Sequence, residues 1–346
     1  MKSFLIVLVC CFTIVVPANA LEIEAPAVPE RGREWMPVHT DSIQNGLSEL
    51  FQKVLGAIHP DIFEASKVSL AIVSAVLMLS ILQDFSSSVQ KTAEMCGTVV
   101  IASVMLTNTN SMICLASNTI QEIGNYGVLL LPVMTGALAA QGSVTTSGAL
   151  YAGTALFNSV LQAVIGNVLM PGVYLFLGLC IGSNATGEIL LKKIADLIKN
   201  SMSWFLKILL IIFTTYLSLS GVISGTTDAA ALKAAKVGMS TFIPVVGSVL
   251  SDASEAVLIS AGLMKNAAGI YGIIAVLALF LHPFLKLAAH YLILKLTGGI
   301  CGIFGSARIT GIIDAFGTAM GLLLGMTGAS CIMVLISTVC FMKGVT

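Results

Sequence analysis

The sequence predicts an all-α polytopic membrane protein, and its composition is the main reason. Of the 346 residues, 57% are hydrophobic and only 10% are charged, and the mean hydropathy is +0.98. A soluble domain carries about 25% charged residues, so this chain cannot build a surface that faces water all round. We predict about six to eight transmembrane helices, together with two segments that proline and glycine interrupt.

The first twenty residues, MKSFLIVLVCCFTIVVPANA, have the pattern of a secretory signal peptide. Lys2 is followed by a short apolar run, and Ala18-Asn19-Ala20 supplies the small residues of a cleavage site. Cleavage after Ala20 would leave the mature N-terminus on the extracytoplasmic side. The alternative is an uncleaved first helix.

Residues 21–65 are expected to form an extracytoplasmic region, because they hold eight acidic residues against three lysines and arginines. Three prolines in the first half predict an extended tether. From Asp41 to Glu64 the apolar residues recur at helical spacing, which predicts an amphipathic helix. Its apolar face could lie on the membrane surface or meet a partner protein.

Residues 66–346 are expected to form the membrane domain, in which each crossing needs about 20 apolar residues. Six stretches meet or approach this length: Val68–Leu82, Cys96–Ala116, Ala163–Ser183, Phe205–Ile223, Ala268–Leu287 and Ala315–Met342. Two further intervals, Ile123–Gln162 and Ala229–Ala267, fit the template badly. We therefore expect helix breaks or hinges at five positions: Pro132, Pro244, Gly247, Gly269 and Pro283.

The two interrupted intervals suggest an internal repeat. Pro132 and Pro244 are 112 residues apart, and so are Pro171 and Pro283. Interrupted segments at corresponding positions of two halves are typical of transporter folds. The possible repeat units are residues 96–183 and 205–290.

Charge placement adds a prediction about the first interval. Lysine and arginine concentrate in cytoplasmic loops. The segment around Glu122 lacks them, whereas residues 184–204 hold Lys192, Lys193 and Lys199. One crossing must separate these segments, so we predict that Ile123–Gln162 is a re-entrant hairpin. The same scheme places three further basic residues on the cytoplasmic side: Lys286, Lys295 and Arg308.

The stretch Thr241–Gly272 carries the candidate functional residues Asp252, Glu255, Lys265 and Asn266. Ionisable side chains at membrane depth are costly and usually face a bundle interior or a transport pathway. The alternative is structural: Ser251 could cap an interfacial helix whose first turn holds the two acids.

A second polar group is formed by His282, Lys286 and His290, which lie four residues apart and so share one helical face. A proton relay is one interpretation. An interfacial polar cluster at the cytoplasmic end of the span is the other.

Several function classes find no support in the sequence. The motifs G-x-S-x-G, H-E-x-x-H and the P-loop are missing, so we expect neither an enzyme nor a bound cofactor. The cysteines form no C-x-x-C or Cys/His cluster, which argues against a metal site. Zero net charge gives no basic face for nucleic acid.

The run Leu232–Gly272 resembles the signature region of the stage III sporulation protein AE family of endospore-forming bacteria. The family-like positions are Lys236, Phe242, Ile243, Pro244, Gly247, Asp252, Ala253, Lys265, Asn266 and Gly269. The leader and the multi-span C-terminal part are similar too, although residues 21–65 form a shorter N-terminal region than is usual for the family.

This resemblance implies a permease-like or pore-associated component of the channel complex that joins mother cell and forespore and sustains forespore development. It also implies a place in the mother-cell membrane around the forespore, in the lipid bilayer, beside the other membrane proteins of the same operon. Two alternatives stay open. One is a non-conducting membrane scaffold for that complex, and the other is a stand-alone secondary transporter.

Overall fold

The computed structural model describes residues 26–38, 42–84, 90–242, 247–304 and 306–343, with the backbone alone at 82–84, 90, 91, 93, 220–242, 247–261 and 264. The signal-peptide prediction for residues 1–20 lies outside these ranges. Within them the elements are helices throughout: α2 (Glu30–Arg33), α3 (Ile43–Ala57), α4 (His59–Asp84), α5 (Gln90–Ala140), α6 (Val144–Val164), the π-helix η1 (Ile165–Leu169), α7 (Met170–Thr186), α8 (Ile189–Phe242), α9 (Gly247–Phe304) and α10 (Ala307–Lys343).

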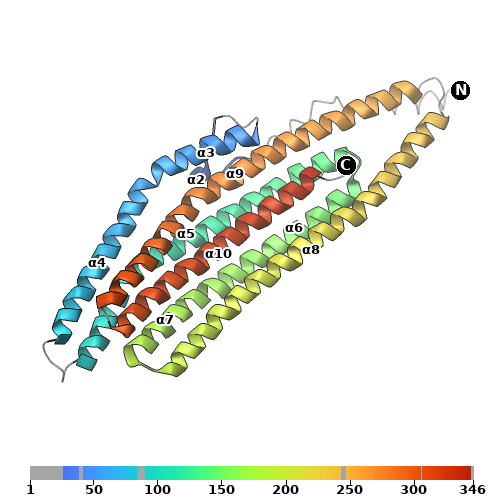
Figure 1. Ribbon diagram of the computed structural model, residues 1–346. Helices are drawn as coiled ribbons and strands as arrows, with labels where there is room; N and C mark the ends of the chain where they lie inside the picture. The colour runs from blue at the N-terminus through green and yellow to red at the C-terminus, as the bar shows by residue number, and fades with distance from the viewer. Residues whose placement is uncertain (1–25, 39–41, 85–89, 243–246, 305, 344–346) are drawn as a thin grey trace.

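The long helices lie side by side in one elongated bundle, in which α6, η1 and α7 form a single continuous rod (Figure 1). Across the described residues, six helical segments are long and apolar enough to cross a membrane. The prediction of an all-α polytopic membrane protein is therefore confirmed.

The helices are much longer than a single crossing requires. α5, α8 and α9 contain 51, 54 and 58 residues, which makes them about 76–87 Å long at 1.5 Å per residue. The hydrocarbon core is about 30 Å thick and transmembrane helices tilt by at most about 40°. Part of each long helix must therefore lie outside the core.

The breaks predicted inside these helices are absent. α5 runs through Pro132, and α9 runs through both Gly269 and Pro283. In an apolar environment backbone groups need partners within the chain, so a helix tolerates proline more readily than an open loop. Gly247 is the first residue of α9, so a helix boundary does fall at this predicted position. Pro244 lies outside the described residues.

A helical hairpin does cover Ile123–Gln162, but it is not re-entrant. Residues 123–140 continue α5 in the direction of the preceding span, and the chain reverses only at 141–143, between α5 and α6. The hairpin therefore lengthens the bundle instead of returning into it. The predicted reversal assumed that Pro132 ends a helix, whereas α5 continues through this residue.

The reversal is a tight turn that requires glycine. Gly142 has φ of 85°, its N–H donates to the Ala139 carbonyl at 2.9 Å, and the Ser143 N–H donates to the Leu138 carbonyl at 3.3 Å. These two bonds are those of a Schellman motif, which satisfies carbonyls at a helix C-terminus.

The proline pairs that suggested a repeat do not occupy equivalent places. Pro132 lies inside α5, whereas residue 244 falls between the last residue of α8 and the first residue of α9. An offset of 112 therefore pairs the middle of one helix with the connection between two others.

The core centres on α10, which packs between α5 and α9. Ile312, Phe316, Met320 and Leu323 of α10 are fully buried. Small residues bring the backbones together: a Cβ on Gly269 of α9 would overlap the side chain of Met342. Such close approach is how helices associate in lipid, where apolar burial gives no driving force between them.

The predicted amphipathic helix forms as α3, and part of its apolar face packs on this same chain, while Phe51 and Leu55 are exposed. Leu50 and Val54 are completely buried in a cluster with Ala278 and Leu281 of α9. Neither predicted surface, the membrane or a partner protein, covers these side chains.

The predicted tether is also packed from residue 26 onward. Val28 is only 3% exposed, and its carbonyl accepts a 2.9 Å hydrogen bond from Nε of Arg33. Arg31 of α2 lies 3.5 Å from Glu122 of α5. Residues 26–38 are therefore a docked segment, since ion pairs and buried apolar side chains hold them against the bundle.

The Gly142 turn gives a first prediction. Replacing Gly142 with alanine should lower stability by about 1–2 kcal/mol, because a side chain is strained at positive φ. Gly148→Ala is the matched control: its added Cβ meets nothing within 4 Å, and alanine favours a helix by up to about 1 kcal/mol. Thermal unfolding of both purified variants in detergent measures the difference. Equal melting temperatures would contradict the turn geometry.

Candidate functional site

The four residues predicted to line a pathway are spread along the first part of α9. Asp252 and Glu255 lie on helical backbone, and their side chains are outside the described residues. Lys265 is buried, with 5% of its surface exposed, whereas Asn266 is exposed. The backbone thus places these residues on one helix, and a pathway role for them stays a prediction.

The structural alternative for the two acids needs correction. α9 begins at Gly247, so Ser251 lies inside the helix and cannot be its N-cap. The described part of this stretch contains the end of α8 at Phe242 and a regular helix from Gly247 to Gly272, whose glycines are accommodated by the helical backbone.

This part of α9 projects beyond the bundle together with the end of α8 (Figure 1). A Cβ on Gly262 would meet Gln141 in the α5–α6 turn, which marks where the bundle ends. The residues of α9 before Gly262 therefore extend past that turn by about 22 Å. We call residues 220–242 of α8 and 247–261 of α9 the projecting hairpin.

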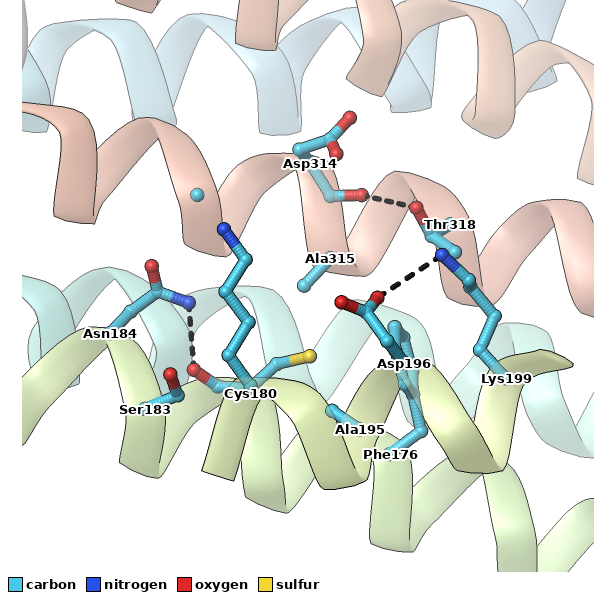
Figure 2. Close-up of a pocket in the computed structure, with 12 residues that line it drawn as sticks. Phe176, Cys180, Ser183, Asn184, Ala195, Asp196, Lys199, Asp314, Ala315 and Thr318 are labelled. Atoms are coloured by element: carbon cyan, nitrogen blue, oxygen red, sulfur yellow. Dashed lines mark hydrogen bonds and ion pairs between the residues drawn. The ribbon is translucent and has the colours of Figure 1, made fainter. Parts of the chain in front are cut away.

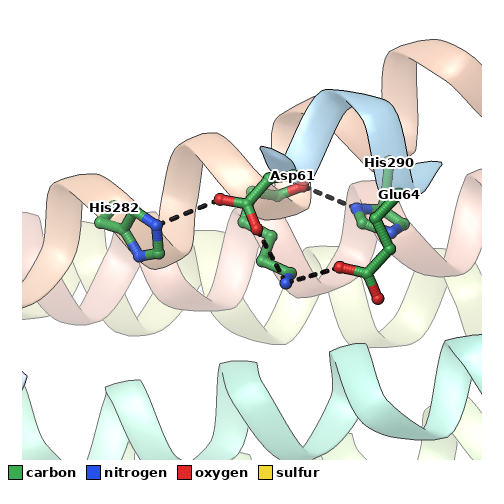
Figure 3. A network of polar contacts seen from close by, with 5 residues as sticks. Asp61, Glu64, His282 and His290 are labelled. Carbon is green, nitrogen blue, oxygen red and sulfur yellow. Dashed lines mark hydrogen bonds and ion pairs between the residues drawn. The ribbon is translucent and has the colours of Figure 1, made fainter. Parts of the chain in front are cut away.

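Where the N-terminal region meets α9, charged residues form a network (Figure 3). Nζ of Lys286 lies 2.8 Å from Oδ1 of Asp61 and 3.0 Å from Oε2 of Glu64. Nε2 of His282 lies 3.1 Å from Oδ2 of Asp61, and its ring stacks on Trp35 with centroids 4.5 Å apart. The predicted polar face of α9 thus finds acidic partners on α4, which sequence spacing alone could not reveal.

His290 takes a different role from the one a relay would need. Its Nδ1 lies 3.0 Å from the Lys286 carbonyl, one turn back on the same helix, and the residue is 1% exposed. It is therefore joined to its own helix backbone, whereas His282 faces the carboxylate of Asp61.

The three basic residues predicted to share the cytoplasmic side do not lie at one level. Lys286 pairs with the first turns of α4, next to the N-terminal region. Arg308 lies 3.7 Å from Glu94, near the start of α5 and so at the other end of α4, and Lys295 pairs with Asp314. Lys286 therefore lies on the same side as the N-terminal region, whereas the prediction placed the two on opposite sides of the membrane.

Buried polar atoms occur at several points of the apolar bundle, on α5, α6 and α10 and in the α5–α6 turn. Five side-chain oxygens there are buried without a hydrogen-bond partner among the described residues: those of Tyr126, Thr135, Ser143, Thr154 and Ser330. Leaving a buried polar group unpaired costs about 1–3 kcal/mol. We call these five residues the polar interior. Sequence reasoning missed it because isolated hydroxyls do not disturb a hydropathy pattern.

Asn158 shows that the polar interior joins neighbouring helices. Its Nδ2 donates to the Gly124 carbonyl at 3.0 Å, from α6 across to α5. Many other hydroxyls satisfy themselves on their own helix, as Thr327 does by donating to the Leu323 carbonyl at 2.8 Å.

A charged pocket lies at the other end of α8, far along that helix from the projecting hairpin. It has a volume of about 130 Å³ and is bounded by α7, α8 and α10 (Figure 2). Lys199 bridges to Asp196 at 3.2 Å, and Asn184 donates to the Cys180 carbonyl at 2.8 Å. Within the described ranges, no group of His, Cys, Asp and Glu side chains is arranged to hold a metal ion.

Comparison with known proteins identifies the same family as the sequence resemblance. The profile of the family described as Stage III sporulation protein AE matches residues 34–344. The Stage III sporulation protein AE of Bacillus subtilis (strain 168) is 26% identical over 240 residues, which are 69% of this chain and 60% of that relative. The chain thus matches less than two thirds of the relative's length. No solved structure matches it significantly.

The charged network of Figure 3 gives a second prediction. Lys286→Met leaves the Asp61 side chain, which is 11% exposed, without its closest cation. We expect a loss toward the lower end of the about 3–5 kcal/mol that breaking a buried ion pair costs. Faster trypsin cleavage at Arg31 and Arg33 and a lower melting temperature would report it.

The control is Lys193→Met, which removes the same charge from an exposed position and should change stability by no more than about 0.5 kcal/mol. Adding Asp61→Asn to Lys286→Met should recover part of the loss. An unaltered cleavage rate in Lys286→Met would show that the network does not hold the N-terminal region.

Proposed function

Because the chain belongs to the stage III sporulation protein AE family, it is a sporulation membrane protein, and we propose a more specific role for it. It acts as a permease-like or pore-associated component of the channel that joins mother cell and forespore. It lies in the mother-cell membrane around the forespore, with the N-terminal region on the extracytoplasmic side.

The observation that carries this proposal is the polar interior of a bundle that is longer than the membrane is thick. Unpaired hydroxyls such as those of Thr154 and Ser330 destabilise an apolar core. They are compatible with folding where water, a passing solute or another protein can reach them. Irregular or polar groups at membrane depth are tolerated where they line such a cavity.

Within its described part, one copy of the chain does not enclose an open channel in its core. Tyr126, Phe213, Phe316 and Phe341 are at most 1% exposed and fill the space between the helices. A conducting path therefore needs either a rearrangement of the bundle or several chains around one axis. The first would suit a stand-alone secondary transporter, and the second a role within an assembly.

The projecting hairpin suits contact with other proteins of the assembly. It extends past the α5–α6 turn and past the end of α10 (Figure 1), so few elements of its own chain lie beside it. We propose that the other membrane proteins of the same operon bind there. A non-conducting scaffold would bind its partners through the same hairpin. Its activity would not depend on the polar interior.

A third prediction separates the conduit from the scaffold. Thr154→Val and Ser330→Ala remove oxygens that are unpaired within the described residues, so neither should lower the melting temperature. If the polar interior serves passage, heat-resistant spore counts and forespore gene expression should fall by an order of magnitude or more. Ser337→Ala is the control, since this hydroxyl already donates to its own helix, at the Val334 carbonyl.

Membrane levels of each variant are measured alongside, so that loss of protein is not taken for loss of passage. Normal spore counts in Thr154→Val and Ser330→Ala, with normal protein levels, would exclude passage through this interior and leave the scaffold.

A fourth prediction concerns the hairpin. Exchanging Asp252 and Glu255 for alanine should reduce co-purification with the other membrane proteins of the operon, because these are acidic residues on the projecting part. Glu188→Ala, an exposed acidic position beside the opposite end of α8, is the control. Undiminished co-purification in the double variant would show that these acids are not at the interface.

A further inference from the structure

Two hollows lie end to end along the seam between α8 and α10. The first is the charged pocket of Figure 2. The second is an apolar groove of about 270 Å³, whose lining includes Leu169, Met202, Leu206, Leu210, Gly321 and Gly325. Both helices contribute to both hollows, so the two form one continuous feature of the bundle surface.

The spacing of the hollows is the same on each helix. On α8 the charged pocket ends at Lys199 and the groove begins at Met202. On α10 the pocket ends at Thr318 and the groove begins at Gly321. Three residues correspond to about 4.5 Å along a helix, so a polar compartment passes into an apolar one within a single helical turn.

One of the lysines that line the charged pocket has no acidic partner within the described residues. Asp196 is paired with Lys199, and Asp314 is paired with Lys295. Lys192 lines the same pocket, is exposed, and makes no ion pair within the described part of the chain. The pocket therefore offers one unmatched positive charge, which a singly charged anion would complement.

Glycines and a π-helix shape the groove. Gly321 and Gly325 place two positions without side chains on its α10 wall, and Leu169 ends the π-helix η1 on the opposite side. Lys207 at the groove has a long stem that can lie on apolar surface while its ammonium reaches the polar end. The lining otherwise suits a hydrocarbon chain.

We propose that this seam binds a glycerophospholipid of the surrounding membrane, with its phosphodiester at Lys192 and an acyl chain in the groove. The order of the hollows matches a lipid in the leaflet nearest the start of α8. Polar groups lie near the helix end and apolar groups lie deeper. The pocket lining carries two lysines and two aspartates, and the phosphodiester would supply the counter-charge that Lys192 lacks within the described residues. The inference does not depend on the proposed conduit.

The test uses the purified full chain, stripped of lipid in a mild detergent, with three probes: phosphatidylglycerol, a diacylglycerol with the same acyl chains, and inorganic phosphate. Only phosphatidylglycerol should raise the melting temperature, because it alone supplies both the phosphate and the chains. An equal rise with diacylglycerol, or with inorganic phosphate, would overturn the proposal.

Variants test whether the rise in melting temperature arises from binding at Lys192 and in the groove. Lys192→Gln should abolish most of the rise, whereas Lys193→Gln, which removes the neighbouring charge outside the pocket, should keep it. Gly325→Leu fills the groove without touching a charge and should also abolish the rise. A full response to phosphatidylglycerol in Lys192→Gln would refute the site, and this arm decides even if Gly325→Leu does not fold.

Discussion

The architecture depends on one constraint: inside a bilayer, a backbone group must find its hydrogen-bond partner within the protein. The chain meets it with helices of up to 58 residues that continue through Pro132 and Pro283. Reversals are confined to short turns, two of which carry a glycine at positive φ, Gly142 and Gly187. Gly187 ends α7 with its N–H donated to the Ser183 carbonyl at 2.8 Å. The bundle is long because the backbone is kept helical wherever possible.

The sequence was a good guide to which segments are helical and a poor guide to where they end. Each predicted span lies within one helix, except Ala163–Ser183, which lies within the rod of α6, η1 and α7. Hydropathy, however, measures solubility in lipid, and it says little about a helix that continues past the membrane. Proline and glycine predicted breaks because they destabilise an isolated helix. In this bundle the helices that contain them, α5 and α9, are packed against α10. The 112-residue spacing of the prolines therefore described no structural equivalence.

For the polar residues, the sequence predicted faces but not partners. The four-residue spacing of His282, Lys286 and His290 placed them on one side of a helix, and the structure confirms that arrangement. Their acidic partners on α4 lie more than 200 positions earlier in the chain, which no local pattern encodes. The polar interior escaped notice for another reason. Its members are single hydroxyls far apart in the chain, and their burial depends on packing that no local pattern encodes.

The docking of residues 26–57 on α9 also constrains how the protein is made. Leu50 and Val54 have their apolar partners, Ala278 and Leu281, far along the chain, and such non-local contacts form late because a long loop must close first. Until α9 has been made, these apolar side chains of the N-terminal region lack their partners. Any chaperone or early assembly partner would meet that face first, and the arrival of α9 would then displace it. Insertion of α9 is thus also the step that completes the N-terminal region.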